Sequence, residues 1–563
     1  MKKYSLFNLF LIVMFGLLLR IWFLDKPEGL WNDEYVGWHI ASQKDLWAFF
    51  QSMVRNCHTP LYYLYLKIWM FFFGDTDTIL RYSSVIPSIL SIIVMFHTGK
   101  EIKDKNLGYL CAFVTAISSF LIYFAQEVRL YSLLFFFTSF ANLYAVKLLK
   151  RPNRYDMLRL FIFCMLVVFT HTLGIIYVFL LLTISAYFII SELDEKKRQK
   201  VIHNLIYCVL FPIIAIGILI FPFLYNIFTY KSLSQFWTNF SCAKIILTFT
   251  DYFSPIQSNI INTYDHFLTY IVPGNTVNYI FIIFAIIPML IGAAAIIIAL
   301  KRKNKAIVCL FSSAAVFFIY IVLISHTGRM ILITKYTTEM YPALLLTMCF
   351  GLYSITNKKI STSIIALYLS LNLFYVFTAP NAVQRLGRSE GHYAVVKLLR
   401  TSNLKDNDYV LITYYDIAKF EKYLTKEDKY KLFSINKFNF NEYMYKDPDY
   451  RNVIQNGKYI YKDVFRIFPN KNITDYVENT FIKNMKKGDR IGIITLDSVS
   501  FLTNRDIVST LEDNKRYDEA QYIFLVFSAL KNSLYYAFKD KYIIDTITQA
   551  GSWTLIVYKK VKD

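Results

Sequence analysis

Two adjacent carboxylates, Asp33 and Glu34, lie close to the start of the chain in the segment Trp-Asn-Asp-Glu-Tyr at 31–35. They follow an apolar run and are surrounded by aromatic residues, which predicts a position near the boundary of a membrane. A carboxylate held in a low-dielectric region has its pKa raised toward neutrality. Such a group can take a proton from an acceptor hydroxyl or amine as a general base. The alternative is that both are ordinary acids in a solvated loop.

A second polar segment contains Gln126, Glu127, Arg129 and Tyr131. Ionisable residues beside membrane spans usually have a function or a partner. Glu127 and Arg129 are two positions apart, so on a helix they would not share a face, and a local ion pair is not expected. Anchoring of the chain at the membrane interface is the alternative interpretation of this segment.

Several single polar residues could complete a site with these two segments: His58, Tyr62, Arg81, His171, Arg329, Lys335 and Tyr336. A histidine beside a proline either starts a helix as a hydrogen-bond partner or acts as a ligand. Cations near an interface either extend their charged ends into water or bind a phosphate. The residue types alone leave both alternatives open for each of them.

The elements that must position these residues are membrane helices. The 563 residues are 56% hydrophobic and only 18% charged, against roughly a quarter charged in a soluble domain. The apolar residues form blocks long enough to cross the hydrocarbon layer as helices. The first block lacks a small-residue cleavage site, so we interpret it as a retained helix. We predict eleven spans: 5–24, 79–98, 107–124, 131–149, 157–170, 172–190, 203–225, 279–300, 306–324, 339–355 and 360–378.

The orientation follows from the distribution of Lys and Arg, which collect on the cytoplasmic side of membrane proteins. Alternate loops, near 100–105, 147–154, 196–200, 301–305 and 358–359, are rich in both. The N-terminus is therefore expected in the cytoplasm and the C-terminus outside, with all the candidate residues on the outer face. The apolar segment 61–73 is too short to span, so we predict an interfacial helix on that face.

The chain thus divides into a membrane domain, 1–378, with outer loops 25–78 and 226–278, and a soluble extracytoplasmic α/β domain, 379–563. In the second domain we predict a helix at 392–400 and strands at 409–413, 490–495, 521–527 and 554–558. The net charge of +21 is spread between apolar blocks, which argues against nucleic acid as a partner. The seven cysteines show no CxxC spacing, so neither a disulfide framework nor a zinc site is predicted.

The order of these motifs resembles the GT-C class of polytopic glycosyltransferases, in particular the group of protein O-mannosyltransferases, aminoarabinose transferases and lipopolysaccharide-core sugar transferases. Members have an acidic pair in the first outer loop, like Asp33-Glu34. They continue with motifs similar to His-Thr-Pro-Leu-Tyr-Tyr at 58–63, Leu-Arg-Tyr-Ser-Ser at 80–84 and Gln-Glu-Val-Arg-Leu-Tyr-Ser at 126–132. A later Arg-Tyr element with a following proline is similar to Lys335-Tyr336. Thr59 and Ser83 depart from prolines of the family pattern.

The resemblance implies an enzyme that moves a hexose or pentose from a polyprenyl-phosphate carrier to a glycan, lipid or protein acceptor, with inversion, in the cell envelope. Asp33 would be the general base, assisted by Glu34 or Glu127. Arg81, Arg129 and Lys335 would neutralise the departing phosphate. No cofactor is required by this pattern, although a divalent cation at Asp33 and Glu34 is left open. The expected location is a membrane, with a bacterial inner membrane favoured. A transporter or flippase of lipid-linked sugars is the alternative function.

Overall fold

The computed structural model describes residues 2–25, 29–55, 59–191, 242–253, 276–327 and 331–378 of the N-terminal part. In the C-terminal part it describes 392–434 apart from 403, 406–407, 413–421, 426 and 429–430, followed by 482–496, 542–550 and 553–561. A few single positions between these ranges are also described. The chain forms two compact units. The first comprises 1–26 and 36–380, and the second comprises 27–35 and 381–563. The short segment 27–35 thus belongs with the C-terminal residues.

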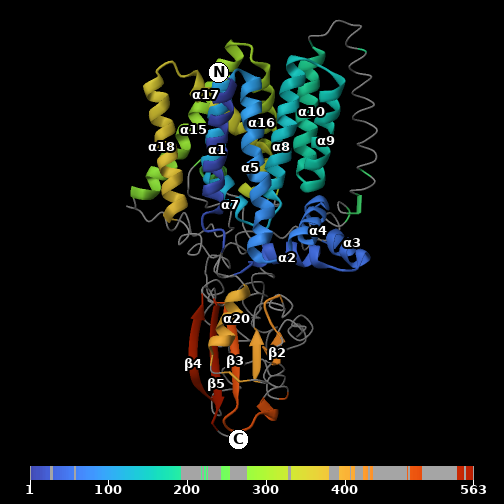
Figure 1. Ribbon diagram of the computed structural model, residues 1–563, viewed down its shortest axis with the longest axis vertical. Coiled ribbons are helices and arrows are strands. Elements are labelled where there is room, and N and C mark those ends of the chain that lie inside the picture. Colours follow the sequence, from blue (N-terminus) through green and yellow to red (C-terminus); the bar gives the residue numbers. More distant parts are fainter. Residues whose placement is uncertain are drawn as a thin grey trace, which may run out of the picture. The chain divides into compact units, whose positions relative to one another are not determined.

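The first unit is a bundle of helices (Figure 1). Ten of the eleven predicted spans coincide with helical segments among the described residues, and the remaining one, 203–225, lies almost entirely outside them. The helices are α1 (Lys2–Ile21), α5 (Asp77–Ile102), α6 (Lys105–Ile117), α7 (Ser119–Ala125), α8 (Tyr131–Lys150), α9 (Arg154–Thr170), α10 (Gly174–Ile190), α15 (Thr276–Lys301), α16 (Lys305–His326), α17 (Tyr341–Ser354) and α18 (Lys358–Thr378).

Three of these helices, α5, α8 and α16, are individually long and apolar enough to cross a membrane, and the α6–α7 pair makes a fourth if its two halves count as one span. This holds for the described part of the chain. Side-chain caps start several of the helices at the loops between the apolar blocks. The Asp104 carboxylate accepts hydrogen bonds from the Asn106 and Leu107 amides at the start of α6, at 2.9 and 3.0 Å. Such caps satisfy amides that have no partner inside the helix.

The predicted span 107–124 is broken at Ser118, where the chain bends by 57° between α6 and α7. A break inside a membrane exposes backbone groups that must find other partners. Arg20 of α1 donates to the Thr115 and Ala116 carbonyls, at 3.1 and 2.8 Å. The Asn372 amide oxygen of α18 accepts from the Ser119 N–H at 2.8 Å. The predicted span is therefore two helices joined at a bend, and residues distant in sequence stabilise that bend.

Small residues allow close contacts between helices, as is common in membrane bundles. A Cβ atom at Gly108 of α6 would lie 2.7 Å from the Phe96 carbonyl oxygen of α5. A Cβ atom at Gly351 of α17 would lie 2.6 Å from the Ile291 carbonyl oxygen of α15. No side chain fits at either distance, so both helix pairs depend on glycine at these positions.

The two predicted outer loops also contain helices. The first holds α2 (Asn32–Ser42), α3 (Leu46–Arg55) and α4 (Leu61–Phe73), and α4 has the bounds of the predicted interfacial segment. Lys67 of α4 donates to the carbonyls of Ala41 and Gln43 at the end of α2, at 3.1 and 2.5 Å. The described part of the second loop contains α13 (Cys242–Phe253), which the sequence did not predict.

The second unit contains a five-stranded mixed sheet in the order β2-β1-β3-β5-β4. The strands are β1 (Tyr409–Ile412), β2 (Lys431–Ser434), β3 (Arg490–Leu496), β4 (Tyr542–Ala550) and β5 (Trp553–Lys560). β1 pairs in parallel with β2 and β3, with Val410 opposite Leu432 and Gly492. β5 pairs antiparallel with β3 and β4. β2 and β4 were not predicted, and the expected strand at 521–527 lies outside the described residues.

Helix α20 (His392–Thr401) covers one face of this sheet (Figure 1). Val395 and Leu399 of α20 are fully buried against Val410, Ile494 and Val557 of the sheet. Val395 and Leu399 are four positions apart and so share one face of α20, while alternate residues of each strand share one face of the sheet. These two apolar faces pack against each other. The second unit therefore has a hydrophobic core of its own.

Candidate functional site

The acid pair lies in the first turn of α2, and Glu34 is part of the N-terminal cap of this helix. The Tyr35 amide donates to the Trp31 carbonyl at 2.9 Å, which makes Trp31 the N-cap residue. The Glu34 carboxylate, three positions on, accepts from the Trp31 amide at 3.2 Å. This is the reciprocal half of a capping box. Glu34 is 1% exposed, whereas Asp33 is half-buried. The two acids therefore differ: Glu34 closes the helix end, and Asp33 is the more accessible.

The Gln-Glu-Val-Arg segment connects α7 to α8 and is not helical. Gln126 donates to the Arg20 and Trp22 carbonyls at the end of α1, at 3.1 and 2.6 Å. Ser84 of α5 donates to the Glu127 carbonyl at 2.5 Å, and the Arg129 amide donates to the same oxygen at 2.8 Å. Glu127 and Arg129 are 1% and 6% exposed. Contacts to α1 and α5 thus fix this segment and hold two ionisable side chains inside the bundle.

Arg81 of α5 and Tyr62 of α4 are also buried. Arg81 donates to the Leu24 carbonyl, just after α1, at 3.3 Å. Tyr62 lies beside Gly37 of α2, where a Cβ atom would be 3.6 Å both from the Tyr62 ring and from the Val128 carbonyl oxygen. Within the first unit, α2 therefore packs closely against α4 and against the Gln-Glu-Val-Arg segment.

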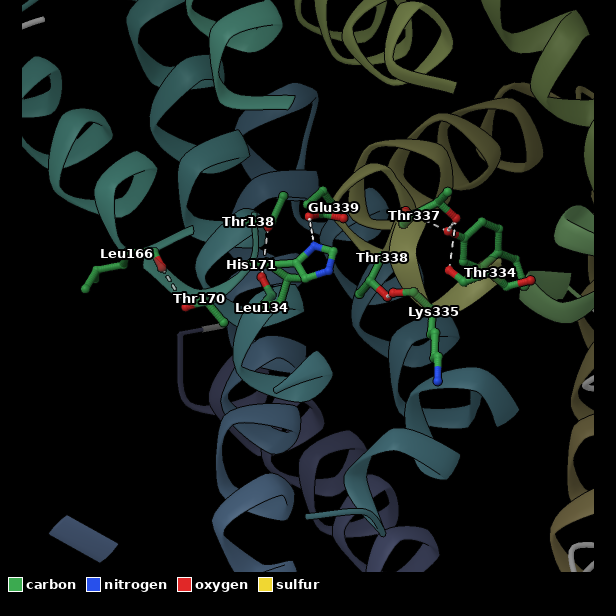
Figure 2. A network of polar contacts seen from close by, with 11 residues as sticks. Leu134, Thr138, Leu166, Thr170, His171, Thr334, Lys335, Thr337, Thr338 and Glu339 are labelled. Atoms are coloured by element: carbon green, nitrogen blue, oxygen red, sulfur yellow. Dashed lines mark hydrogen bonds and ion pairs between the residues drawn. The ribbon is translucent and has the colours of Figure 1, made fainter. Parts of the chain in front are cut away.

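A histidine–carboxylate pair lies in the interior of the first unit. His171, in the turn between α9 and α10, is joined through Nδ1 to Glu339 Oε1 at 2.6 Å (Figure 2). Glu339 lies in a 3₁₀ helix, η3 (Thr334–Met340). The two side chains are 4% and 0% exposed. The distance is at the short end for a charge-assisted hydrogen bond. The pair links the α9–α10 turn to the segment that precedes α17.

Four more of the predicted residues extend this pair into a continuous group. The Tyr131 and Tyr336 rings lie 6.5 and 6.0 Å from the His171 ring. The Arg129 guanidinium lies 5.8 Å from the centre of the Tyr131 ring. The Lys335 ammonium lies 5.4 Å from the centre of the Tyr336 ring. Both distances are within cation–π range. We call this group the His171 cluster; its members are Arg129, Tyr131, His171, Lys335, Tyr336 and Glu339.

The backbone of η3 is fixed by the unpredicted helix α13. Thr334 donates to the Asp251 carboxylate at 2.5 Å, and Tyr252 donates to the Thr337 carbonyl at 2.7 Å. The Tyr252 ring stacks on Tyr341, the first residue of α17, with 4.4 Å between ring centres. Figure 2 shows Lys335 extending away from the His171–Glu339 pair, while Thr334 and Thr337 lie on the other side of η3. Contacts on both sides of η3 therefore determine where Lys335 and Tyr336 point.

The structure thus brings Arg129, Tyr131, His171, Lys335 and Tyr336 together, from three separate parts of the chain. Asp33 and Glu34 belong to the second unit. His58 and Arg329 lie outside the described residues.

The sequence reasoning missed Glu339 and Asp251, which are both fully buried. Glu339 stands at the predicted outer end of the span 339–355, and an ionisable residue at that position was a signal that could have identified it. Asp251 had no comparable signal, because its helix was predicted as part of a loop.

The arrangement can bind an anion. Arg129 and Lys335 supply positive charge, and the hydroxyl groups of Tyr131 and Tyr336 are potential donors to an oxyanion. Within the described residues, no group of three or more His, Cys, Asp or Glu is placed to hold a metal ion. Glu339 Oε2 has no hydrogen-bond partner in the described part of the chain.

Comparison with solved structures shows that the chain has the fold of the GT-C class of membrane glycosyltransferases. The match is to ArnT from Cupriavidus metallidurans bound to undecaprenyl phosphate. It has 12% sequence identity, covers 97% of both chains and has a TM-score of 0.50. Within the part of the chain that the structure describes, three helices are long and apolar enough to span, and the fold is that of a GT-C structure; both findings support a membrane protein.

Two further solved structures are similar at TM-scores below 0.5. The protein O-mannosyltransferase Pmt1-Pmt2 complex of S. cerevisiae, bound to its sugar donor, is 18% identical; the match covers 46% of this chain and 36% of that one, with a TM-score of 0.32. The oligosaccharyltransferase AglB from Archaeoglobus fulgidus, with an inhibitory peptide and a dolichol-phosphate, is 11% identical; the match covers 94% and 72%, with a TM-score of 0.45. No family model and no curated protein matches the sequence.

Proposed function

We propose that the protein is a glycosyltransferase that transfers a sugar from a polyprenyl-phosphate carrier to an acceptor on the outer face of a membrane. The observation that carries the proposal is the His171 cluster, in which two cations and two tyrosines from separate segments meet inside a GT-C fold. The similar ArnT structure is bound to undecaprenyl phosphate, a ligand whose phosphate such a cluster would suit.

In the proposed reaction, Asp33 takes the proton of the acceptor hydroxyl or amine while the acceptor oxygen or nitrogen attacks the anomeric carbon. The bond from that carbon to the carrier phosphate breaks, and the configuration inverts. The greater exposure of Asp33 supports its assignment as the base, because Glu34 is committed to the helix cap. Arg81, Arg129 and Lys335 stabilise the charge that develops on the departing phosphate, which is usually a large catalytic term. Glu127 assists in positioning the acceptor.

The topology that goes with this proposal has a cytoplasmic N-terminus and an extracytoplasmic C-terminal domain, in a bacterial inner membrane. The residue range 1–378 is then the catalytic membrane domain. The sugar, a hexose or a pentose, and the acceptor, a glycan, a lipid or a protein, are left for the assay to identify. The same assay, run with and without EDTA, tests whether a divalent cation acts at Asp33 and Glu34.

The test is transfer in proteoliposomes that contain the purified protein and one of several radiolabelled undecaprenyl-phosphate hexoses or pentoses. We expect label to move to an acceptor, or slowly to water as free sugar. An Asp33→Asn variant should lower this rate by at least about a hundredfold, in the range expected of general-base catalysis. Asp156→Asn, which changes a carboxylate at the start of α9, is the matched control and should be as active as the wild type. If wild type and Asp33→Asn carry the labelled lipid across the bilayer equally well and transfer none of it, the protein is a transporter.

A further inference from the structure

The segment that leads into the acid pair is held by residues of the C-terminal domain. The Leu30 amide donates a hydrogen bond to the Tyr423 hydroxyl at 2.7 Å. Leu30 precedes the N-cap residue of α2, and the next amide, that of Trp31, is taken by Glu34. The two backbone donors directly before the helix are therefore both bound by side chains, which fixes the path on which the chain enters α2.

The backbone at Gly29 also contacts the C-terminal residues closely, in a way that only glycine allows. Its φ of +80° is a conformation that favours glycine. A Cβ atom at Gly29 would lie 2.8 Å from the Tyr423 hydroxyl oxygen and 2.8 Å from Tyr393 Cβ. The Tyr393 and Tyr423 rings are 5.5 Å apart, and both pack on the core between α20 and the sheet. The glycine backbone thus lies directly against two tyrosines that the core holds in place.

Tyr423 is itself fixed by a network of charged hydrogen bonds. Arg400 of α20 donates to the Tyr423 carbonyl at 3.2 Å and makes two hydrogen bonds to the Asp428 carboxylate, at 3.0 and 2.7 Å. Asp428 also accepts from the Thr425 amide at 2.8 Å. The turn that contains Tyr423 is therefore tied to α20 at its beginning and at its end.

We propose that Tyr423 is a positioning residue for the acid pair, and that the C-terminal domain thereby sets the geometry of catalysis. The Tyr423 hydroxyl holds the Leu30 amide in place. Leu30 and Glu34 together fix the first turn of α2, and Asp33 lies in this turn. The inference rests on the proposed function, in which Asp33 is the base. Loss of the Tyr423 hydroxyl should leave the donor-binding residues unchanged and loosen only the turn that carries the base.

The test compares Tyr423→Phe with Tyr542→Phe in the full-length protein. Tyr423→Phe keeps the ring and its packing and removes the acceptor of the Leu30 amide. Tyr542→Phe removes a hydroxyl of the same unit whose hydrogen bond is to the Met485 sulfur. For the labelled lipid that the wild type uses, Tyr423→Phe should lower kcat about tenfold, because small displacements of a catalytic group are costly. KM for that lipid should change less than about twofold, since uniform binding of the donor is untouched.

Hydrogen exchange provides a readout independent of turnover. The Leu30 amide should exchange at least about tenfold faster in Tyr423→Phe than in wild type, since the bond that protects it is gone, and Tyr542→Phe should leave its exchange unchanged. Unchanged Leu30 exchange, or a kcat equal to that of Tyr542→Phe, would overturn the positioning role. An Asp33→Asn protein that remains fully active would instead refute the proposed base, whatever the exchange data show.

Discussion

The acid pair and the His171 cluster are held in place by different kinds of contact. Glu34 and Leu30 are fixed by hydrogen bonds that involve the backbone next to a helix end, in a segment with one partly accessible acid. His171 and Glu339 are joined to each other inside the bundle and are almost completely buried. A buried polar pair is costly to break, whereas a backbone contact at a helix end is modest in free energy.

This difference separates a contact that stabilises the fold from one that sets the rate. The His171–Glu339 pair at the centre of the cluster joins η3 to the α9–α10 turn, so substitutions of this pair should first affect folding. The contacts at the start of α2 are single hydrogen bonds of modest free energy, so substitutions there should first affect the rate. The predictions for Asp33 and Tyr423 concern the second region, and the next three examine how strongly the interior contacts and the C-terminal domain stabilise the fold.

The largest effect on stability is expected for Glu339→Ala. The substitution leaves His171 Nδ1 buried without its acceptor, and the free energy of unfolding should fall by about 3 kcal/mol. Glu339→Gln keeps an amide oxygen that can accept from Nδ1 and should cost only about 1 kcal/mol. Thermal unfolding of the detergent-solubilised protein, with chemical denaturation where it is reversible, measures both.

Glu101→Ala is the matched control for Glu339→Ala. Glu101 lies 3.9 Å from Lys150, and both side chains are more than a third exposed. A surface pair of this kind contributes about 0.5 kcal/mol or less. If Glu339→Ala is no more destabilising than Glu101→Ala, the His171–Glu339 pair does not hold the interior, and the contrast between the two regions is wrong.

A smaller effect is expected for Arg20→Met, which tests the broken span. Arg20 donates to Ser88 and to three carbonyls, of which two lie at the end of α6. Methionine fills similar space but leaves those carbonyls without a donor, so the free energy of unfolding should fall by about 2 kcal/mol. Arg159→Met removes an arginine that is 54% exposed and should change it little. Equal melting curves for the two variants would mean that the break does not need Arg20.

Much of the bundle could be predicted because a long run of apolar residues is enough to identify a membrane helix. The long apolar runs gave α5, α8 and α16, and the short run at 61–73 gave α4 with its bounds. The break at Ser118 could not be predicted, since its partners, Arg20 and Asn372, lie about a hundred or more positions away. Hydropathy averages over a window and does not register such contacts.

The candidate site was predictable to a similar degree. Arg129, Tyr131 and His171 were chosen by residue type and by their position at the ends of apolar blocks. The pairing of Glu339 with His171 could not be predicted, because the two residues are separated by 168 positions. The attachment of residues 27–35 to the C-terminal unit was also missed, because nothing near Leu30 indicates a bond to Tyr423. In the sheet, β4 had a readable signal in the β-branched residues of Tyr-Ile-Ile-Asp-Thr-Ile-Thr.

The smallest effect concerns the acid sensitivity of the C-terminal domain. The Arg400 guanidinium holds the pKa of the Asp428 carboxyl well below its usual range, with help from Thr425. A carboxyl whose pKa is lowered in the folded state stabilises the domain at pH values above its unfolded pKa of about 3.9, and this contribution is lost progressively as the pH falls from there through the folded-state pKa. Burial raises the pKa of Asp408, and this raised pKa changes the stability of the domain with pH in the opposite direction.

The Asp428→Asn variant isolates the contribution of the Asp428–Arg400 pair, since Asp408 is the same in the wild type and in the variant. The loss at neutral pH should be below about 1 kcal/mol, because the Arg400 side chain is 37% exposed and solvent screens the pair. Hydrogen exchange of peptides from β1, β3 and β5, compared between wild type and variant at each pH, should show a difference at pH 7 that shrinks progressively once the pH falls below about 4. Because Arg400 also holds the Tyr423 carbonyl, the Leu30 amide should lose protection over the same range. A difference that stays constant with pH would show that the pair has no part in holding the turn that contacts Leu30.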